Sequence, residues 1–267
     1  MGLPSLFQKN ILMKYWFVFC KTDILLQQLP DGSHSVPCQE EPPVPTQPWT
    51  AIHCIGKLHG HEVCTYRIEV PPSSSGGLLQ CGLRASYYKL PQDIYLMAGK
   101  CQEILYWDFN TQYCGVCGGP MKMHTEISKR CTECGKEVWP QLATAVIVLV
   151  HRGDEVLMVH ARNFRGTFYG LVAGFVETGE TLEEAVAREV LEETGLHICN
   201  IRYFRSQPWP YPCGLMVGFH ADYVSGNIRL QREELSGGGW FRRDNLPELP
   251  EKLSIARQLI DDWLSNS

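Results

Sequence analysis

The sequence predicts an α+β protein in which two folded domains flank a small cysteine-rich insert. Short apolar runs separated by proline- and glycine-rich joints fill residues 1–110. Two C-x2-C pairs lie within residues 111–138, and residues 139–267 alternate strand patterns with helix patterns. The first domain contains no recognisable catalytic motif, so we expect it to serve as a scaffold or dimerisation domain.

Composition and charge narrow the class of protein. The 267 residues, of which 44% are hydrophobic, suffice for one large core or two smaller ones. A formal net charge of −5 excludes a broadly basic nucleic-acid coat. The apolar run at residues 11–20 contains Lys14, is too short to span a bilayer and lacks a small-residue cleavage site. We therefore expect a cytoplasmic protein that has no membrane partner.

The first domain is expected to combine strands with one helix. Residues 15–19, 24–29 and 63–70 have the composition of strands. Residues 92–110 predict a helix, because apolar side chains recur at spacings of three and four: Ile94, Met97, Ala98, Cys101, Ile104 and Leu105.

Four of the twelve cysteines form two pairs, Cys114 with Cys117 and Cys131 with Cys134. Each tight C-x2-C turn directs two thiolates at one point, and the thirteen residues between the pairs can form a hairpin that brings them together. Four thiolates complete a tetrahedral shell and leave no position for water. We therefore predict one structural Zn²⁺ per chain rather than a catalytic metal. The other eight cysteines are scattered singly.

Basic side chains flank this zinc ribbon and leave its role open. Zinc ribbons often bind nucleic acid, and a basic patch would serve that purpose. An ordinary solvated charged face explains the same residues equally well: Lys122, Lys129, Arg130 and Lys136.

The second domain is expected to be a mixed α/β domain. Residues 142–150 and 155–160 predict two strands joined by a hairpin turn at 151–154. A terminal amphipathic helix is expected at about 251–264. Further strands are expected at residues 171–175, 201–206 and 215–224.

A helix with clear boundary signals follows the third of these strands. Thr181, with Glu184 three residues later, forms a capping box that starts the helix. Gly195 ends it as a C′ residue. The apolar residues spaced to face the core are Leu182, Val186 and Val190.

Three carboxylates share another face of this helix. Glu189, Glu192 and Glu193 stand at spacings of i, i+3 and i+4, where they repel one another unless a cation lies between them. Mg²⁺ or Mn²⁺, which prefer oxygen ligands, would supply that charge, and so would Arg188. A solvated acidic face also explains the glutamates. The preceding loop, residues 174–180, adds two glycines and further acids at the same end of the helix, which favours a metal site.

The segment that contains this helix resembles the Nudix box, G-x5-E-x7-R-E-U-x-E-E-x-G-U. Downstream, residues 206–212 are similar to the S-Q-P-W-P-[FY]-P signature of the NADH pyrophosphatase (NudC-type) branch of Nudix hydrolases. The resemblance implies a Nudix α/β/α sandwich over residues 139–267, preceded by a zinc ribbon and a smaller N-terminal α+β domain. The box matches at all nine defined positions, which are Gly174, Glu180, Arg188, Glu189, Val190, Glu192, Glu193, Gly195 and Leu196.

The resemblance also assigns roles at the metal site. It implies that Glu189 and Glu193 bind catalytic Mg²⁺ or Mn²⁺, and that Glu192 is a further ligand or a base that orients water. The backbone carbonyl of Ala173 and the side chain of Glu234 are implied as additional ligands. Glu233 is the adjacent alternative to Glu234. Arg188 is expected to be structural and to pair with the acids of the loop.

Aromatic side chains are implied for substrate recognition, because bases stack on them. Phe175 resembles the stacking position of the family, and Trp139 the aromatic residue that reaches into the partner subunit's site, which implies a homodimer. Glu126 and the backbone of Ala256 are implied as further contacts. The chain departs from the family at Gly214, where a serine is usual. The signature loop supplies Gln207, Pro208, Trp209, Pro210, Tyr211, Pro212, Cys213 and Gly214.

Not all of these residues need to act on substrate. Trp209 also fits a packed core residue. Lone histidines beside strands are more often satisfied structural residues than metal ligands, and this applies to His124, His160 and His220.

The function that the resemblance implies is hydrolysis of the diphosphate of NAD(H) to nicotinamide mononucleotide and AMP. The same chemistry would remove an NAD cap from an RNA 5′ end. One alternative is a Nudix hydrolase of another nucleoside diphosphate, such as ADP-ribose. A second is a catalytically silent zinc-ribbon protein that binds RNA, against which the complete set of box glutamates and the negative net charge argue.

Overall fold

The computed structural model describes residues 12–70, 72, 77–163 and 166–266, so the first residue of the apolar run at 11–20 lies outside the described residues. The chain divides into two compact units, Met1–Gln141 and Leu142–Ser267. Within the described ranges no helix is both long and apolar enough to cross a membrane.

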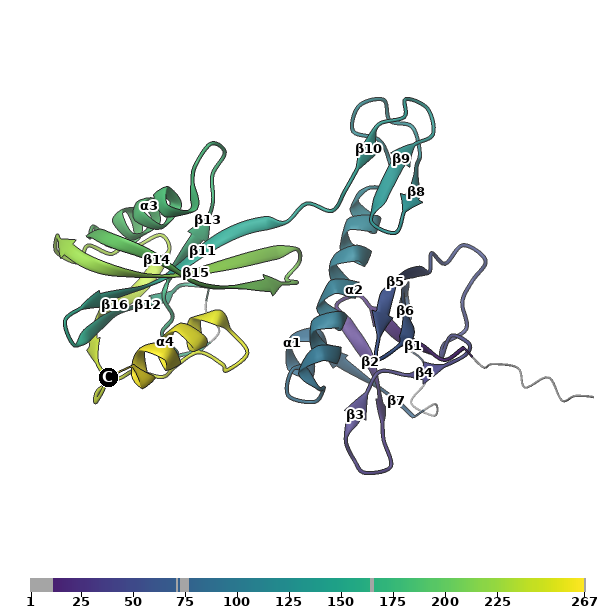
Figure 1. Cartoon of the computed structure of the whole chain (residues 1–267), viewed down its shortest axis with the longest axis horizontal. Helices are drawn as coiled ribbons and strands as arrows, with labels where there is room; N and C mark the ends of the chain where they lie inside the picture. The colour runs from purple at the N-terminus through teal and green to yellow at the C-terminus, as the bar shows by residue number, and fades with distance from the viewer. Residues whose placement is uncertain (1–11, 71, 73–76, 164–165, 267) are drawn as a thin grey trace, which may run out of the picture. The chain divides into compact units, whose positions relative to one another are not determined.

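The first unit contains a sheet in the order β3-β2-β1-β6-β5, with β4 on β1 and β7 on β2 (Figure 1). Strand β1 pairs in parallel with β6, and Trp16, Val18 and Tyr66 are buried between them and their neighbours. The three predicted strands are confirmed as β1, β2 and β6. The strands are β1 (Lys14–Cys20), β2 (Asp23–Gln28), β3 (His34–Ser35), β4 (Cys38–Gln39), β5 (His53–Leu58), β6 (His61–Ile68) and β7 (Leu78–Gly82).

Two helices complete this part of the unit, the short α1 (Leu83–Ser86) and the long α2 (Gln92–Asn110). The predicted helix at 92–110 is confirmed. Among the apolar positions that predicted it, Met97 is half-buried and the others are buried. The 3.6-residue period therefore identified the face of α2 that packs.

One cysteine pair was not predicted. Cys54 on β5 lies opposite Cys64 on β6, with the Cα atoms 4.2 Å apart, and the two form a disulfide. The pairing depends on the register of two antiparallel strands across a bulge, which spacing along the chain does not reveal.

The zinc ribbon follows α2 as a three-stranded sheet in the order β10-β9-β8. Its strands are β8 (Met121–Thr125), β9 (Ser128–Cys131) and β10 (Glu137–Val138), and the β8–β9 hairpin confirms the predicted turn-back between the cysteine pairs. Lys129 does not lie on a solvated face: it is buried, and its Nζ contacts Asp108 Oδ1 at 2.6 Å. This lysine therefore ties the ribbon to the end of α2.

The second unit is a six-stranded sheet in the order β14-β15-β11-β12-β16, with β13 on β11. Strands β11 and β15 run parallel, and the other pairs are antiparallel. The predicted strands and the terminal helix are confirmed, although β14 begins and ends beyond its predicted range. The strands are β11 (Ala143–Arg152), β12 (Glu155–Ala161), β13 (Val172–Phe175), β14 (His197–Trp209), β15 (Gly214–Ser225) and β16 (Leu235–Arg242).

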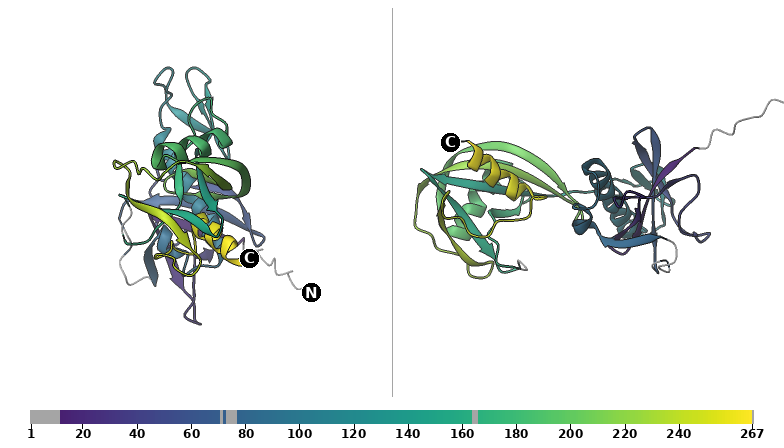
Figure 2. Two further views of the ribbon diagram at one scale, coloured as in Figure 1. Left: turned by 90° about the vertical axis from the view of Figure 1, so that its left-hand side faces the viewer. Right: turned by 90° about the horizontal axis from the view of Figure 1, so that it is seen from below.

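Helices cover both faces of this sheet. Helix α3 (Leu182–Thr194) lies on one face and α4 (Ile255–Ser265) on the other, where α4 crosses in front of the strands when the molecule is seen from below (Figure 2). Alternate residues of β11 point into the two cores, because successive side chains of a strand face opposite sides. Val146 and Val148 pack with α3, and Ile147 and Leu149 pack with α4. The predicted α/β/α sandwich is confirmed.

Candidate active site

The boundaries of α3 fix where its carboxylates point. Thr181 Oγ1 accepts from the backbone N–H of Glu184 at 3.2 Å, and the Glu184 carboxylate accepts from the backbone N–H of Thr181 at 2.8 Å. Gly195 ends the helix in the left-handed region, with φ 72°. The predicted capping box and C′ glycine are both confirmed, so the register of the helix is set by the sequence itself.

Gly174 lets a helix carboxylate lie against the backbone of β13. A Cβ atom at this position would stand 2.0 Å from the carboxyl carbon of Glu189. Any other residue would therefore push the carboxylate away. The requirement for glycine at the start of the Nudix box is steric in this chain.

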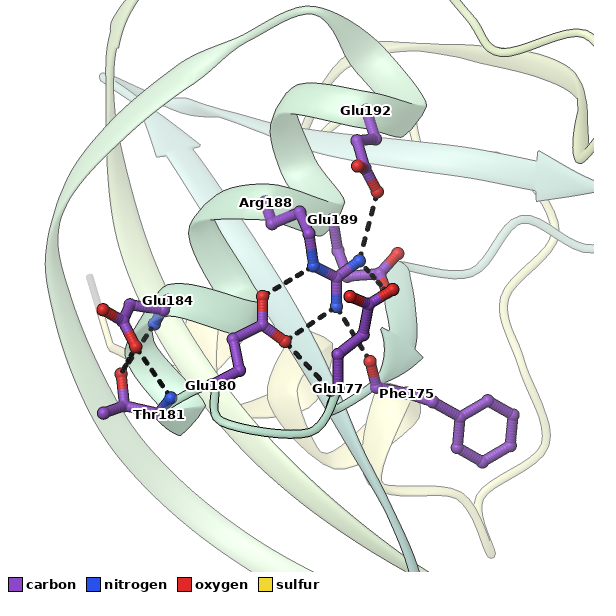
Figure 3. Close-up of polar contacts among 8 residues, drawn as sticks. All are labelled: Phe175, Glu177, Glu180, Thr181, Glu184, Arg188, Glu189 and Glu192. Atoms are coloured by element: carbon purple, nitrogen blue, oxygen red, sulfur yellow. Dashed lines mark hydrogen bonds and ion pairs between the residues drawn. The ribbon is translucent and has the colours of Figure 1, made fainter.

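Arg188 lies at the centre of a dense polar network (Figure 3). Its Nε and Nη2 donate to the two oxygens of Glu180 at 2.6 and 3.0 Å, in a fork that suits a carboxylate. Nη1 donates to Glu189 at 2.8 Å and to Glu192 at 3.1 Å, and Nη2 also donates to the carbonyl of Phe175 at 2.9 Å. The prediction that Arg188 pairs with acids of the preceding loop is confirmed.

Glu193 lies deeper than the other box glutamates. Its side chain is 4% exposed, and burial together with the charges of Glu189 and Glu234 raises its pKa to about 8. Burial also raises the pKa of Glu189, despite the adjacent Arg188. Buried carboxylates that destabilise one another's charged forms are a suitable site for a divalent cation, which would restore their ionisation.

Glu234, rather than Glu233, acts electrostatically on the helix carboxylates. It is among the causes of the raised pKa of both Glu189 and Glu193, whereas Glu233 is not. Both residues line one pocket with Glu193 and Ala173. The pocket has a volume of about 440 Å³, within the range of small-molecule sites. We call it the acidic pocket.

A second pocket is mostly apolar and aromatic, and we call it the aromatic pocket. It is lined by Phe175, which is 66% exposed, and by Trp209 and Tyr211, whose rings meet edge to face at 5.1 Å. Ala173 lines both this pocket and the acidic pocket. The other residues around the aromatic pocket are Ala143, Ala145, Gly174, Pro212, Cys213, Gly214 and Met216.

Gly214 controls how closely the wall of the aromatic pocket packs. A Cβ atom here would lie 3.0 Å from the carbonyl oxygen of Trp209 and 3.3 Å from its Cβ. A serine at this position would therefore need a small shift of Trp209. The departure from the family pattern lies in the pocket wall and does not contact the carboxylates.

Other predicted substrate contacts lie in different surroundings. The amide of Gln207 donates to the carbonyl of Leu253 at 2.7 Å and accepts from the N–H of Ile255 at 2.7 Å, so it holds the start of α4. Ala256 is buried in α4, and Pro208 and Pro210 lie outside the lining of both pockets. Glu126 and Trp139 are exposed in the first unit. Their contacts with substrate stay predictions.

Several residues at the pockets were not predicted. Arg162 and Asn163, which follow β12, line the acidic pocket, and Ala143, Ala145 and Met216 line the aromatic pocket. Arg162 could have been predicted as a candidate, because it is a basic residue directly after a predicted strand. The small and apolar residues could not have been predicted, because nothing in the sequence distinguishes them from other strand residues.

Two of the three histidines, His160 and His220, have structural partners, in agreement with the simpler interpretation. His160 contacts Ser236 Oγ at 2.6 Å and the carbonyl of Gly166 at 2.9 Å. His220 Nδ1 lies 2.9 Å from His151 Nε2, beneath α4. His124 is exposed on β8. None of these three predicted candidates lines the acidic pocket among its described residues.

The four ribbon cysteines converge as a zinc site requires. Their Sγ atoms all lie within 4.8 Å of one another, and the pairs Cys114–Cys134 and Cys117–Cys131 are 3.6 and 3.4 Å apart. A tetrahedral site with Zn–S bonds of about 2.3 Å separates its sulfurs by roughly 3.8 Å. Backbone N–H groups also donate to Sγ of Cys114 and Cys131, at 3.4 Å in each case, which favours thiolates. The residues therefore fit a structural Zn²⁺.

Comparison with known proteins shows the family. Residues 140–263 match a model of the NUDIX domain, residues 13–107 an NADH pyrophosphatase-like rudimentary NUDIX domain, and residues 110–138 an NADH pyrophosphatase zinc ribbon domain. A protein of Stutzerimonas stutzeri named NAD-capped RNA hydrolase NudC is 41% identical over 214 residues, which span 79% of this chain and 76% of the relative. The chain is a Nudix hydrolase of the NADH pyrophosphatase family.

Further relatives in this family carry the same name. The Pseudomonas aeruginosa protein is 40% identical over 82% of this chain and 78% of its own length. The Yersinia pestis protein is 40% identical over 80% of each chain. Membership of the Nudix family implies a divalent metal, and the acidic pocket, which has the buried Glu193 in its wall, fits one.

Proposed function

We propose that this Nudix hydrolase cleaves the diphosphate of NAD(H) with one water, giving nicotinamide mononucleotide, oxidised or reduced, and AMP. We extend the proposal to the NAD cap of RNA, where the same cleavage leaves a 5′-monophosphate. The name of the relatives supports the NAD cap of RNA as a substrate. The names of the matching family models support NADH. The observation that carries the proposal is the shared wall at Ala173, which places an aromatic pocket directly beside an acidic one.

The two pockets suit the two parts of such a substrate. A nicotinamide or adenine ring presents a flat π face that can stack on Phe175 and Trp209. The adjoining diphosphate would then reach Glu193 and Glu234. Bound Mg²⁺ or Mn²⁺ would neutralise the diphosphate and activate the attacking water.

Each residue of the site would have a distinct role in the reaction. Glu189, Glu193 and Glu234, with the carbonyl of Ala173, would hold the divalent ions, and Glu192 would complete their shell or orient the water. Arg188 would keep Glu189 and Glu192 in place through the bonds it already makes. The buried position of Glu193 limits competition from bulk water.

The proposal also covers the oligomeric state and the role of the first domain. We propose a cytoplasmic homodimer in which residues 1–110 act as a scaffold, and in which Trp139 and Glu126 contact substrate. The exposure of Trp139, at 50%, supports this role, because a large apolar side chain is favoured at an interface.

Product analysis by chromatography tests the function. NADH, NAD⁺, ADP-ribose and an NAD-capped RNA would be offered in parallel with Mg²⁺ or Mn²⁺, with Glu193→Gln as the control. We expect mononucleotide and AMP from NADH in the wild type and none in the variant. Preferential cleavage of ADP-ribose would replace the proposed substrate, and no cleavage of any substrate would leave the zinc ribbon as an RNA-binding module.

A further inference from the structure

The acidic pocket contains a cation that the Nudix box does not supply. Arg162 follows the last residue of β12 and lines this pocket together with Glu193, Glu233 and Glu234. It is the one cationic side chain among the described residues that line the pocket. A site that accepts a diphosphate next to three carboxylates needs positive charge beyond that of the metal ions, because the substrate adds negative charge of its own.

Arg188, the other arginine of the neighbourhood, is not available for this purpose. Figure 3 shows its guanidinium enclosed by oxygens from the box helix and the preceding loop. It makes five hydrogen bonds, to Glu180, Glu189, Glu192 and the carbonyl of Phe175. Its donors are already used, so a phosphate oxygen could be bound only by breaking that network.

The hydrogen bonds described for Arg162 involve its backbone N–H and its Nε. Its backbone N–H donates to the carbonyl of Glu234 at 2.8 Å, and its Nε donates to the carbonyl of Arg232. These bonds fix the start of the side chain and the direction of the guanidinium. The bonds described for Arg162 leave both Nη groups as donors to a ligand, and the side chain is exposed.

The loop that Arg162 contacts is itself fastened to α3. The backbone N–H of Gln231 donates to the carbonyl of Glu193 at 2.9 Å, and the N–H of Arg229 donates to the carbonyl of Thr194 at 2.8 Å. Arg162 therefore lies beside a loop whose position relative to α3 is fixed by these backbone hydrogen bonds. A guanidinium fixed in this way loses little side-chain entropy when it binds an oxyanion.

We propose that Arg162 binds the diphosphate of the substrate through its Nη groups at the edge of the acidic pocket. The ligand class is a nucleoside diphosphate linked to a second group, and the inference rests on the proposed function. A planar guanidinium suits this role, since it can donate two parallel hydrogen bonds to phosphate oxygens.

Three variants test the proposal. Arg162→Gln removes the charge, and Arg162→Lys restores a charge without the fork. Arg242→Gln removes a charge from an exposed side chain at the end of β16 that lines neither pocket. We expect Arg162→Gln to raise KM for NADH and to lower kcat/KM by about 10- to 100-fold, the value of hydrogen bonds to a charged group. Arg162→Lys should be intermediate, and Arg242→Gln should stay within about twofold of the wild type.

Metal affinity separates a substrate contact from a role in holding Glu234. Titration with Mn²⁺ alone should give the same affinity for Arg162→Gln and for the wild type. A fall in Mn²⁺ affinity by the same factor as kcat/KM would overturn the proposal, because Arg162 would then act only through the loop. Thermal melts check folding, and Arg162→Met repeats the test with an apolar stem of similar reach should the glutamine variant fail to fold.

Binding of ADP in the presence of Mg²⁺ distinguishes this inference from the proposed function. If the wild type does not hydrolyse NADH but Arg162→Gln still weakens ADP binding about tenfold or more, the proposed function fails and Arg162 remains a diphosphate ligand. If the wild type hydrolyses NADH and the variant changes neither KM nor ADP binding, the role of Arg162 is overturned and the function stands.

Discussion

The zinc ribbon and the acidic pocket offer metal ligands in opposite ways. The ribbon takes all its ligands from residues 114–134, on two knuckles that its own hairpin brings together. The acidic pocket combines Glu193 of α3 with Glu234, which lies in the loop before β16. The first site is saturated by thiolates, and the second is open and lined by carboxylates that disfavour one another's ionisation.

This difference separates a site that supports folding from one that supports chemistry. Four thiolates leave Zn²⁺ no free position, so binding contributes to the stability of the ribbon. Buried carboxylates with raised pKa values oppose stability in the metal-free protein, as expected of groups retained for catalysis. Substitution of a ribbon cysteine should therefore lower the stability of the ribbon. Substitution of a buried carboxylate in the acidic pocket should leave the stability of the metal-free protein unchanged or raise it.

The largest effect is expected for Glu193→Gln. Turnover of NADH should fall by more than about 100-fold, because the loss of a metal ligand exceeds the loss typical of supporting residues. The melting temperature of the metal-free protein should stay the same or rise, since a neutral amide replaces a buried carboxylate.

The matched control is Glu183→Gln, on the exposed surface of the same helix. It should retain wild-type turnover. Equal losses in the two variants would show that charge on α3, rather than the buried carboxylate, supports activity.

Gly174→Ala should lower turnover by about 10- to 100-fold, the range for residues that position metal ligands. The added Cβ would stand 2.0 Å from the Glu189 carboxyl carbon, so that carboxylate must move. Steady-state kinetics with Mn²⁺ as the cofactor measure the loss. Gly153→Ala is the control, since a Cβ there meets no atom within 4 Å, although its φ of 59° adds some backbone strain. Unchanged kinetics in Gly174→Ala would contradict the steric role.

Cys131→Ser should release zinc and unfold the ribbon while the second unit stays folded. Elemental analysis gives the zinc content, and hydrogen exchange should show lost protection within residues 114–138 but not within 142–266. Cys199→Ser, at an exposed position of β14, should keep both zinc and protection. Loss of protection throughout the chain would mean that the ribbon is not an independent site.

Glu103 offers a smaller test, of a buried carboxylate outside the metal site. Burial raises its pKa to about 7, and its Oε1 is buried without a hydrogen-bond partner among the described residues. The pKa in the folded state exceeds the pKa of about 4.3 in the unfolded state. The contribution of Glu103 to the free energy of unfolding is therefore unaffected below about pH 4.3 and becomes less favourable as the pH rises to about 7. Glu103→Gln should raise the melting temperature at pH 8 and leave it unchanged at pH 4. A rise of the same size at both values would contradict the burial argument.

Sequence patterns predicted the elements whose signals are local. The capping box, Gly195, the period of α2 and the cysteine spacing each lie within a few residues, and each was confirmed. Strand β16 was not predicted, because its three consecutive glycines weaken a strand pattern. What escaped prediction depends on tertiary contact: the Cys54–Cys64 pairing, the burial of Lys129 and the position of Arg162.

We propose that the two adjoining pockets act on different parts of one substrate. Calorimetric binding of NADH, measured beside turnover for Phe175→Ala and Glu193→Gln, tests it most directly. Phe175 is 66% exposed, so its truncation should not disturb the fold. We predict that Phe175→Ala weakens NADH binding about 5- to 100-fold, as expected for one stacked base, and that Glu193→Gln binds NADH but does not cleave it. Unchanged binding in Phe175→Ala, or normal turnover in Glu193→Gln, would contradict the account.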